Sequence, residues 1–291
     1  MKTKASALLG CLFLILLLHS PIQAQDDNVL LDWTFWKMAT VTDVESALEG
    51  GADIGARNMI ERTPLHTAAA NSETPEVVKL LLDRGADSEA RTMLGQTPLH
   101  SAAGDNWAPE VVELLLDHGA DISDHDKNGW TPLHFAANFN QIPVVELLLD
   151  RGADRESRDN NGKTPLHWAA FSSRTPAVVE VLLDRGADRE ARDGSGATPL
   201  HWAVLHIEAS VAVVELLLDH GADREARNML GQTPLHRAAA GSYSPEVVEL
   251  LLDRGADGTV RDKQGKTPFD YVQDNKALRN TEAYRRLNGA Q

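Results

Sequence analysis

A four-residue motif, Thr-Pro-Leu-His, recurs along this 291-residue chain at nearly constant intervals. Its threonines are Thr63, Thr97, Thr131, Thr164, Thr198 and Thr233, and a divergent copy begins at Thr267. Successive threonines are separated by 34, 34, 33, 34, 35 and 34 residues. A period of this length is one supersecondary unit, and such units stack into solenoids because none can bury its apolar side alone. The periodicity argues against a single compact core.

The unit that begins at Thr97 predicts two helices. Threonine is a good helix N-cap, and Pro98 suits the first helical position, where its missing N–H has no partner in any case. A second helix around 111–116 is apolar on most of its circumference, so we expect neighbours on two sides of it. Gly119 suits the left-handed end of that helix, and an Asn-Gly pair at 128–129 marks a tight turn before the next unit.

These units resemble the ankyrin repeat. The pattern Thr-Pro-Leu-His-x-Ala-Ala, then Val-Val-x-Leu-Leu-Leu, then Gly-Ala-Asp recurs across roughly 200 of the 291 residues. The resemblance implies antiparallel helix pairs stacked side by side, β-hairpin fingers at right angles to them, and a concave groove formed by the fingers and the first helices. The chain departs from the family pattern in the loop between the two helices. Most units carry one extra residue there, and four of these loops use a proline: Pro75, Pro109, Pro176 and Pro245.

The predicted fold is an all-α, ankyrin-like solenoid of helix-turn-helix units joined by β-hairpin fingers. We expect a secretory signal peptide at 1–24, an N-terminal capping unit at 25–62, six repeats at 63–266 and a C-terminal capping segment at 267–291. The end units are atypical because each end of a stack must present one polar outer face. Two tryptophans of the first cap are expected in its core, Trp33 and Trp36.

The N-terminus has the pattern of a secretory signal peptide. A basic start precedes an apolar run at 5–18, and small or aliphatic residues up to Ala24 precede a cleavable bond. The run is short for a membrane span, which needs ~20 residues. We therefore expect export, with the mature chain periplasmic or secreted after cleavage near Ala24. Two alternatives are an uncleaved membrane anchor and a lipid anchor on Cys11.

Cysteine content and charge agree with an exported, soluble protein. The one cysteine, Cys11, lies inside the predicted signal, so the mature chain would hold no thiol and no disulfide. Without Lys2 and Lys4 the chain has 26 basic and 43 acidic residues, a formal charge of −17. Such a surface repels phosphate backbones and anionic bilayers, so we expect neither nucleic acid nor membrane as a partner. A basic protein partner and simple solubility are both consistent with it.

No residue pattern in the chain predicts catalysis. Aspartates recur once per unit in the Gly-Ala-Asp slot, whereas an active site would be singular, and there is no phosphate loop, HExxH motif or nucleophile elbow. The resemblance implies that the motif histidines are structural. The alternative, a metal ladder, is disfavoured because units stack about 10 Å apart, whereas metal–nitrogen distances are about 2 Å. We predict a non-enzyme without cofactor or metal. The motif histidines are His66, His100, His134, His167, His201 and His236.

Residues that differ between units are candidates for specificity. By the resemblance, partners contact the finger tips and the ends of the first helices. Three tips are apolar, at 59–60, 93–94 and 229–230, whereas the middle tips are polar. Apolar tips are expected either to fold back onto neighbouring fingers or to form an adaptable, Met-rich contact surface. The residues assigned to a partner-binding surface are Met93, Leu94, Met229 and Leu230.

A second candidate surface is aromatic. The residue after the motif histidine packs between first helices in the ankyrin family, so the core is expected to take up Phe135, Trp168 and Trp202. Trp130 precedes a motif threonine, whereas Phe139 and Phe171 follow first helices, in slots that the family leaves open to the groove. Buried aromatic side chains dominate the binding energy of many interfaces. We predict these last three residues as anchors for the partner; surface packing without binding is the alternative.

The sequence therefore predicts an exported, monomeric, protein-binding module that holds a protein partner in its groove and on its finger tips. The alternative is a secreted effector or inhibitor that acts on a host protein or on a co-secreted enzyme. Both hypotheses use the same surface, and they differ in the partner and in the place of action.

Overall fold

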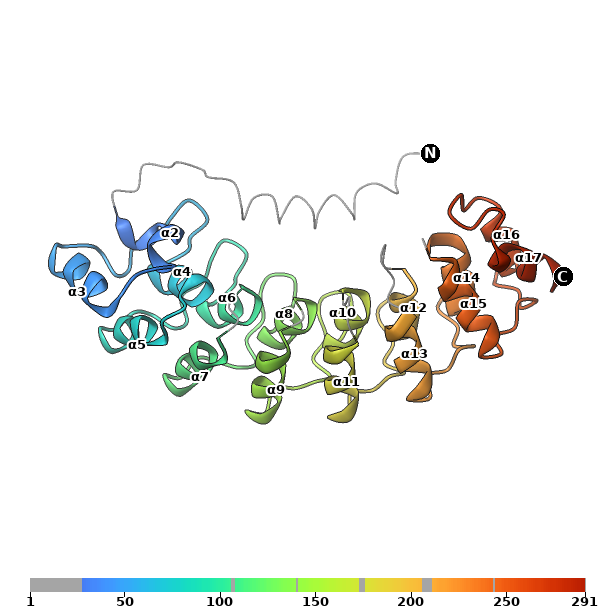
Figure 1. Ribbon diagram of the computed structural model, residues 1–291. Coiled ribbons are helices and arrows are strands. Elements are labelled where there is room, and N and C mark those ends of the chain that lie inside the picture. Colours follow the sequence, from blue (N-terminus) through green and yellow to red (C-terminus); the bar gives the residue numbers. More distant parts are fainter. Residues whose placement is uncertain are drawn as a thin grey trace.

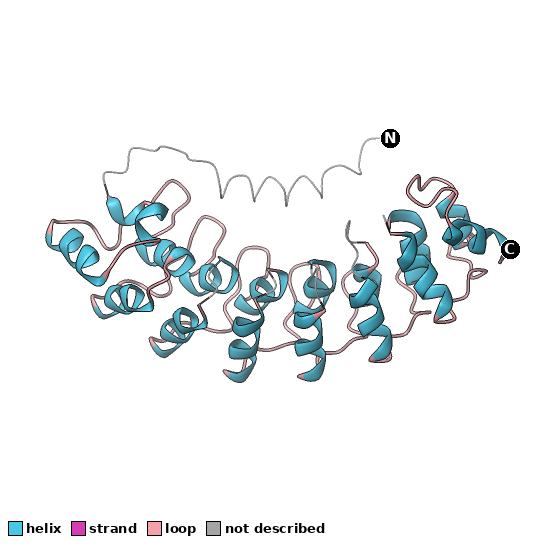
Figure 2. Cartoon of the chain, in the orientation of Figure 1, coloured by secondary structure: helices cyan, strands magenta, loops and turns pink. Residues whose placement is uncertain are grey.

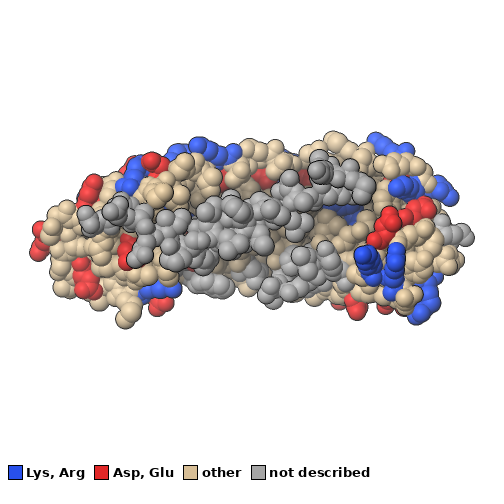
Figure 3. All heavy atoms as spheres, turned by 90° about the horizontal axis from the view of Figure 1, so that it is seen from above, with Lys and Arg blue, Asp and Glu red and all other residues tan. Residues whose placement is uncertain are grey.

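The computed structural model describes residues 28–105, 108–139, 141–172, 176–205, 211–242 and 244–290. Paired helices follow one another along a curved stack whose two caps lie at opposite ends (Figure 1). Helices joined by loops and turns make up the chain within these ranges (Figure 2). Seen from above, the molecule is long in the stacking direction and narrow across it (Figure 3). The signal peptide predicted at 1–24 lies outside the described residues.

Every repeat contributes a first helix and a second helix. The first helices are α4 (Pro64–Asn71), α6 (Pro98–Asp105), α8 (Pro132–Asn138), α10 (Pro165–Ser172), α12 (Pro199–Ala203) and α14 (Pro234–Gly241). The second helices are α5 (Pro75–Asp83), α7 (Pro109–Asp117), α9 (Ile142–Asp150), α11 (Ala177–Asp184), α13 (Val211–Asp219) and α15 (Pro245–Asp253). The N-terminal cap holds the 3-10 helix η1 (Val29–Leu31), α2 (Trp33–Trp36) and α3 (Val41–Glu49). The C-terminal cap holds α16 (Pro268–Val272) and α17 (Glu282–Gly289). First helices pack on first helices and second helices on second helices, which gives two layers.

The all-α solenoid predicted from the repeat is confirmed, and no residue in the described ranges lies in a β-strand. Each finger is a tight hairpin turn closed by a main-chain bond, such as that from the Thr92 N–H to the Gln96 carbonyl (3.0 Å). Neighbouring fingers are joined by a further bond, such as that from the Lys127 N–H to the Leu94 carbonyl (2.9 Å). A β-ladder needs a longer series of such bonds, so the fingers are turns rather than strands.

The motif threonine and histidine start each first helix and tie it to the next finger. The Thr131 N–H donates to Nδ1 of His134 (3.2 Å), and the Thr131 hydroxyl lies 2.9 Å from the same nitrogen. Because Nδ1 accepts, the ring proton is on Nε2, which donates to the carbonyl of Lys163 in the next finger (3.1 Å). All six motif histidines reach a carbonyl of the next finger in this way, and all are buried.

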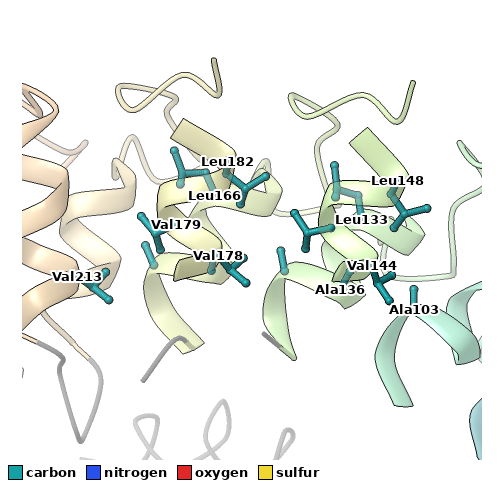
Figure 4. Packing of buried hydrophobic residues seen from close by; sticks show 14 of the residues in the cluster. Ala103, Leu133, Ala136, Val144, Leu148, Leu166, Val178, Val179, Leu182 and Val213 are labelled. Carbon is teal, nitrogen blue, oxygen red and sulfur yellow. The ribbon is translucent and has the colours of Figure 1, made fainter. Parts of the chain in front are cut away.

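The hydrophobic core runs through the whole stack between the helices. Val144 and Leu148 of α9 are fully buried, as is Leu133 of α8. Figure 4 shows these side chains together with Leu166 and Leu182, which fill the corresponding positions of the next unit. The paired alanines of the first helices are also buried, and their small side chains allow adjacent first helices to approach closely. Each unit therefore completes its core only with its neighbours.

The N-terminal cap buries one of its two tryptophans. Trp36 is 1% exposed and donates from Nε1 to the Leu30 carbonyl (2.9 Å). Trp33 is 50% exposed, and the Lys37 ammonium lies 4.6 Å from its ring centroid. The prediction that both rings lie in the core is right for Trp36 and wrong for Trp33, because α2 is about one turn long and only one of its faces meets the stack.

Leu148→Ala should lower the free energy of unfolding by ~2–5 kcal/mol, because it opens a cavity at a fully buried position. Glu146→Ala is the matched control: Glu146 is exposed on the same helix, and we expect a change within ~0.5 kcal/mol. Urea unfolding followed by circular dichroism measures both values. Equal losses at the two positions would mean that the buried and exposed faces of α9 are misassigned.

Burial lowers the pKa of the motif histidines, because the charged imidazolium loses its hydration. The pKa falls from 6.5 to about 4 in His66, His134, His167 and His201, and it is also lowered in His100 and His236. Below pH ~6.5 the unfolded chain therefore binds protons that the folded chain does not bind until about pH 4.

The free energy of unfolding should be largest above pH ~6.5 and should fall as the pH drops from ~6.5 towards ~4, by up to ~1.4 kcal/mol per pH unit for each histidine. The formal charge of −15 shrinks over the same range, and the weaker self-repulsion acts in the opposite direction. Urea midpoints measured between about pH 7.5 and about pH 5 check the sign. A midpoint that stays constant or rises on acidification would contradict the buried, neutral state of the histidines.

Candidate functional site

The first helices lie on the side towards which the two ends of the stack curve (Figure 1), and each of them carries the residue that follows the motif histidine. In three consecutive units this position is aromatic: Phe135 in α8, Trp168 in α10 and Trp202 in α12. The next two units carry Arg237 in α14 and Tyr271 in α16. The concave side of the stack therefore changes its chemistry along the chain while the backbone repeats.

Six rings form one continuous aromatic strip on this side. The Trp130 ring bridges two units, with its centroid 4.4 Å from that of Trp168 and 5.1 Å from that of Phe135. Phe139 extends the series at 6.3 Å from Phe135, nearly parallel to it. Neighbouring aromatic pairs at these distances stabilise each other beyond their burial alone. The aromatic strip comprises Trp130, Phe135, Phe139, Trp168, Phe171 and Trp202.

Phe171 connects the last two tryptophans of the strip. Its centroid lies 6.3 Å from that of Trp168 and 5.6 Å from that of Trp202, edge-on to both rings. The structure thus brings the three predicted anchors, Trp130, Phe139 and Phe171, into one surface. Phe139 is 38% exposed, and the other two are half-buried.

The rings expected in the core belong to the same strip. Trp168 is 9% exposed, which agrees with a core position, whereas Phe135 and Trp202 are half-buried and share the concave surface. The position after the motif histidine is therefore not always a core position in this chain. It supplies half of the aromatic strip.

Finger aspartates hold the tryptophans in place. Trp168 Nε1 donates to Asp159 (3.1 Å), and Trp202 Nε1 donates to Asp193 (2.9 Å). The other oxygen of Asp193 accepts from Ser195 and from the Ala197 N–H, so one carboxylate organises both the finger turn and the ring. Burial opposes the ionisation of Asp193, but these hydrogen bonds outweigh it and lower its pKa. The indoles are consequently fixed before any partner arrives.

The spacing of these pairs was a sequence signal that the repeat analysis missed. The aspartate precedes the ring by nine residues in both tryptophan units, and the cap repeats the pattern with Asp262 and the Tyr271 hydroxyl (2.6 Å). The Phe135 unit also carries an aspartate nine residues upstream, Asp126, but its oxygens accept from Asn128 and from the Trp130 N–H, because phenylalanine has no polar hydrogen to donate.

A lysine lies between the two tryptophans. The Lys163 ammonium is 4.0 Å from the Trp168 ring centroid and 3.7 Å from the Trp202 centroid, and the residue is 9% exposed. A cation over an aromatic face is attracted by the ring quadrupole, the more so where water is excluded. Lys163 therefore stiffens this part of the strip and gives it positive charge.

The apolar finger tips form two separate surfaces rather than one. Met93 and Leu94 are 56% and 38% exposed, and the Met93 N–H is bonded to the carbonyl of Ile60 at the neighbouring apolar tip. Met229 and Leu230 are 62% and 53% exposed. The fingers on either side of this tip are polar. The Met229 N–H donates to the Ser195 carbonyl of one of them, and the Leu230 carbonyl accepts from the Lys263 N–H of the other. The tip residues are thus open to solvent rather than folded into a common core.

Lys and Arg side chains gather towards the C-terminal end of the face seen from above (Figure 3). Within the part of the chain that the structure describes, no group of three or more His, Cys, Asp or Glu residues is arranged to hold a metal ion. None of the helices described there has both the length and the apolar composition needed to cross a membrane.

Comparison with known families gives one match. The profile of the family described as ankyrin repeats (3 copies) matches residues 38–126, 106–193, 152–228, 176–262 and 207–279. These overlapping matches cover the described repeats and parts of both caps. A search of curated proteins finds no match to this chain.

Proposed function

Because the chain belongs to the ankyrin-repeat family, we propose that it is a non-enzymatic protein-binding module that acts after export and holds a protein partner on its aromatic strip. The observation that carries the proposal is the continuity of the strip: six rings around α8, α10 and α12 form one surface, and most of them are only half-buried. The repeats of this family support protein–protein interaction as the function.

The strip suits recognition because its rings are large, amphipathic and already ordered. Immobilising a flexible side chain on binding costs ~0.5–1.5 kcal/mol. For Trp168 and Trp202 this cost is reduced, because Asp159 and Asp193 hold the indoles in the free protein. The partner-facing rings Trp130 and Phe171 lean on these two tryptophans and share their rigidity.

The finger tips supply a second kind of contact. Methionine side chains are flexible and polarizable, so they adapt to more than one partner shape. We propose that Met93 and Leu94, and separately Met229 and Leu230, contact parts of the partner that extend beyond the strip. Their exposure favours this role over packing between fingers.

Export rests on the N-terminal pattern described above. Expressed in its producing cell, the protein should appear in the extracytoplasmic fraction as a chain that begins at Gln25, one residue after Ala24. Mass spectrometry of the purified N-terminal peptide identifies the cleavage point. A chain that retains Met1 and stays in the cytoplasm would refute export and would leave the proposed binding function untouched.

The double variant Trp130→Ala/Phe171→Ala should weaken partner binding at least tenfold, because it removes two central aromatic anchors. Trp33→Ala is the matched control, since Trp33 is an exposed tryptophan of the N-terminal cap, outside the strip. The mature chain and both variants are used to capture proteins from the extracytoplasmic fraction, and the affinity of the captured partner is then measured.

A partner bound equally by all three proteins, with the folded state verified by circular dichroism, would show that the strip is not the binding surface. The identity of the partner separates a resident binding module from an effector or inhibitor, because an inhibitor would capture an enzyme and abolish its turnover at a stoichiometric ratio.

A further inference from the structure

Arg237 interrupts the aromatic series on the concave side. It occupies in α14 the position that holds Trp202 in the preceding unit and Tyr271 in the following one. Its guanidinium carbon lies 5.7 Å from the Trp202 ring centroid. A cation therefore stands between two half-buried aromatic residues of the neighbouring units.

The Arg237 guanidinium is incompletely paired. Its Nε is buried without a hydrogen-bond partner among the described residues. Asp193 is the carboxylate that acts on it through its charge, yet both oxygens of Asp193 are engaged, one by Trp202 and the other by Ser195. A buried donor without an acceptor destabilises the fold, and a charged one does so more. Burial accordingly lowers the pKa of Arg237.

The finger of the same unit does not supply the missing carboxylate. The residue nine positions upstream of Arg237 is Asn228, where the tryptophan and tyrosine units carry an aspartate. The Asn228 side-chain oxygen accepts from the Leu230 and Gln232 N–H groups, so it closes the turn. Arg237 therefore occurs in a unit whose finger has an asparagine, Asn228, in place of the aspartate found in the tryptophan and tyrosine units.

We propose that Arg237 is a carboxylate-binding position, and that the partner segment presents an Asp or Glu side chain to it between apolar side chains that contact Trp202 and Tyr271. This inference rests on the proposed function, since it specifies the partner of the same concave surface. A carboxylate can accept two parallel hydrogen bonds from a guanidinium, so the partner's carboxylate would provide acceptors for the unpaired Arg237 donors.

The spacing of the units sets the spacing of the partner's side chains. Adjacent first helices lie about 10 Å apart, and a segment in the polyproline II conformation advances about 3.1 Å per residue and returns to the same face every three residues. A segment running along the groove would therefore carry apolar residues about three positions before and after its acidic residue. Lys266, whose ammonium lies 5.1 Å from the Tyr271 ring centroid, adds positive charge at one end of this position.

The overall negative charge of the chain does not oppose such a partner at contact. Charges further apart than about 8 Å are largely screened at physiological salt. The charged groups at this position are three cations, Lys163 and Arg237 against the Trp202 ring and Lys266 at the Tyr271 ring. They outnumber the two carboxylates there, Asp193 and Asp262, which accept hydrogen bonds from Trp202 and Tyr271. Complementary local charge at this position favours an acidic segment over a basic one.

The test is selection from a phage-displayed library of random peptides on the purified protein and on two variants, Arg237→Gln and Arg237→Lys. The wild type should enrich peptides with an acidic residue flanked by apolar residues about three positions away. Arg237→Gln should lose the acidic preference, and Arg237→Lys should retain part of it, because lysine keeps the charge without the planar fork.

One enriched peptide and its Asp→Asn version are then compared by fluorescence anisotropy. The wild type should bind the Asn version at least tenfold more weakly, and Arg237→Gln should bind both alike. The melting temperature of Arg237→Gln should equal or exceed that of the wild type, because the variant removes a desolvated charge.

Three results would overturn the carboxylate position: no acidic enrichment on the wild type, the same enrichment on Arg237→Gln, or equal binding of the Asp and Asn peptides to the wild type. A lowered melting temperature of Arg237→Gln would also count against it, since the guanidinium would then stabilise the free fold. Enriched peptides without an acidic residue that lose affinity for Trp130→Ala/Phe171→Ala would leave the proposed function standing and remove only this inference.

Discussion

The hydrogen bond from each motif histidine to the next finger is the interaction on which the rest of the structure depends. The His134 Nε2–H reaches the Lys163 carbonyl across the boundary between units, while its Nδ1 accepts from Thr131 at the start of α8. One buried ring therefore starts a helix and couples that helix to its neighbour. Because the ring must be neutral to make both bonds, burial and hydrogen bonding enforce the same protonation state. This bond fixes the distance between neighbouring units, and the apolar core fills the space between them.

The same bond connects the scaffold to the candidate binding surface. The residue whose carbonyl accepts from the histidine also contributes a side chain to the concave face. Trp130 accepts from His100 (3.0 Å) and places its ring on Trp168, and Lys163 accepts from His134 and places its ammonium between two indoles. The main chain of this residue is constant from unit to unit, whereas its side chain varies. Stability and the proposed recognition are thus assigned to different atoms of one residue.

Much of the fold could be predicted because the determinants are local and repeated. Thr97 and Pro98 start a helix by local chemistry, the apolar pattern at 111–116 requires neighbours, and a constant period means that one solution serves every unit. The anchors Trp130, Phe139 and Phe171 could be proposed for the same reason, since their positions within the unit are known once the period is known. The prediction was weaker where the period breaks, as in the first cap, where Trp33 is exposed although Trp36 is buried.

The sequence by itself determined the stacked helix pairs, the caps and the positions that differ between units, because these follow from a period and from contacts within about one turn of chain. Only the tertiary structure decided that Trp130 leans on Trp168, that Phe171 joins Trp168 to Trp202, and that Arg237 lacks a hydrogen-bond acceptor for its Nε among the described residues. Most of these contacts join different units, and all depend on the direction in which each side chain leaves its helix. The direction of each side chain and the residues it contacts are set by packing between units. The sequence of a single unit does not specify that packing.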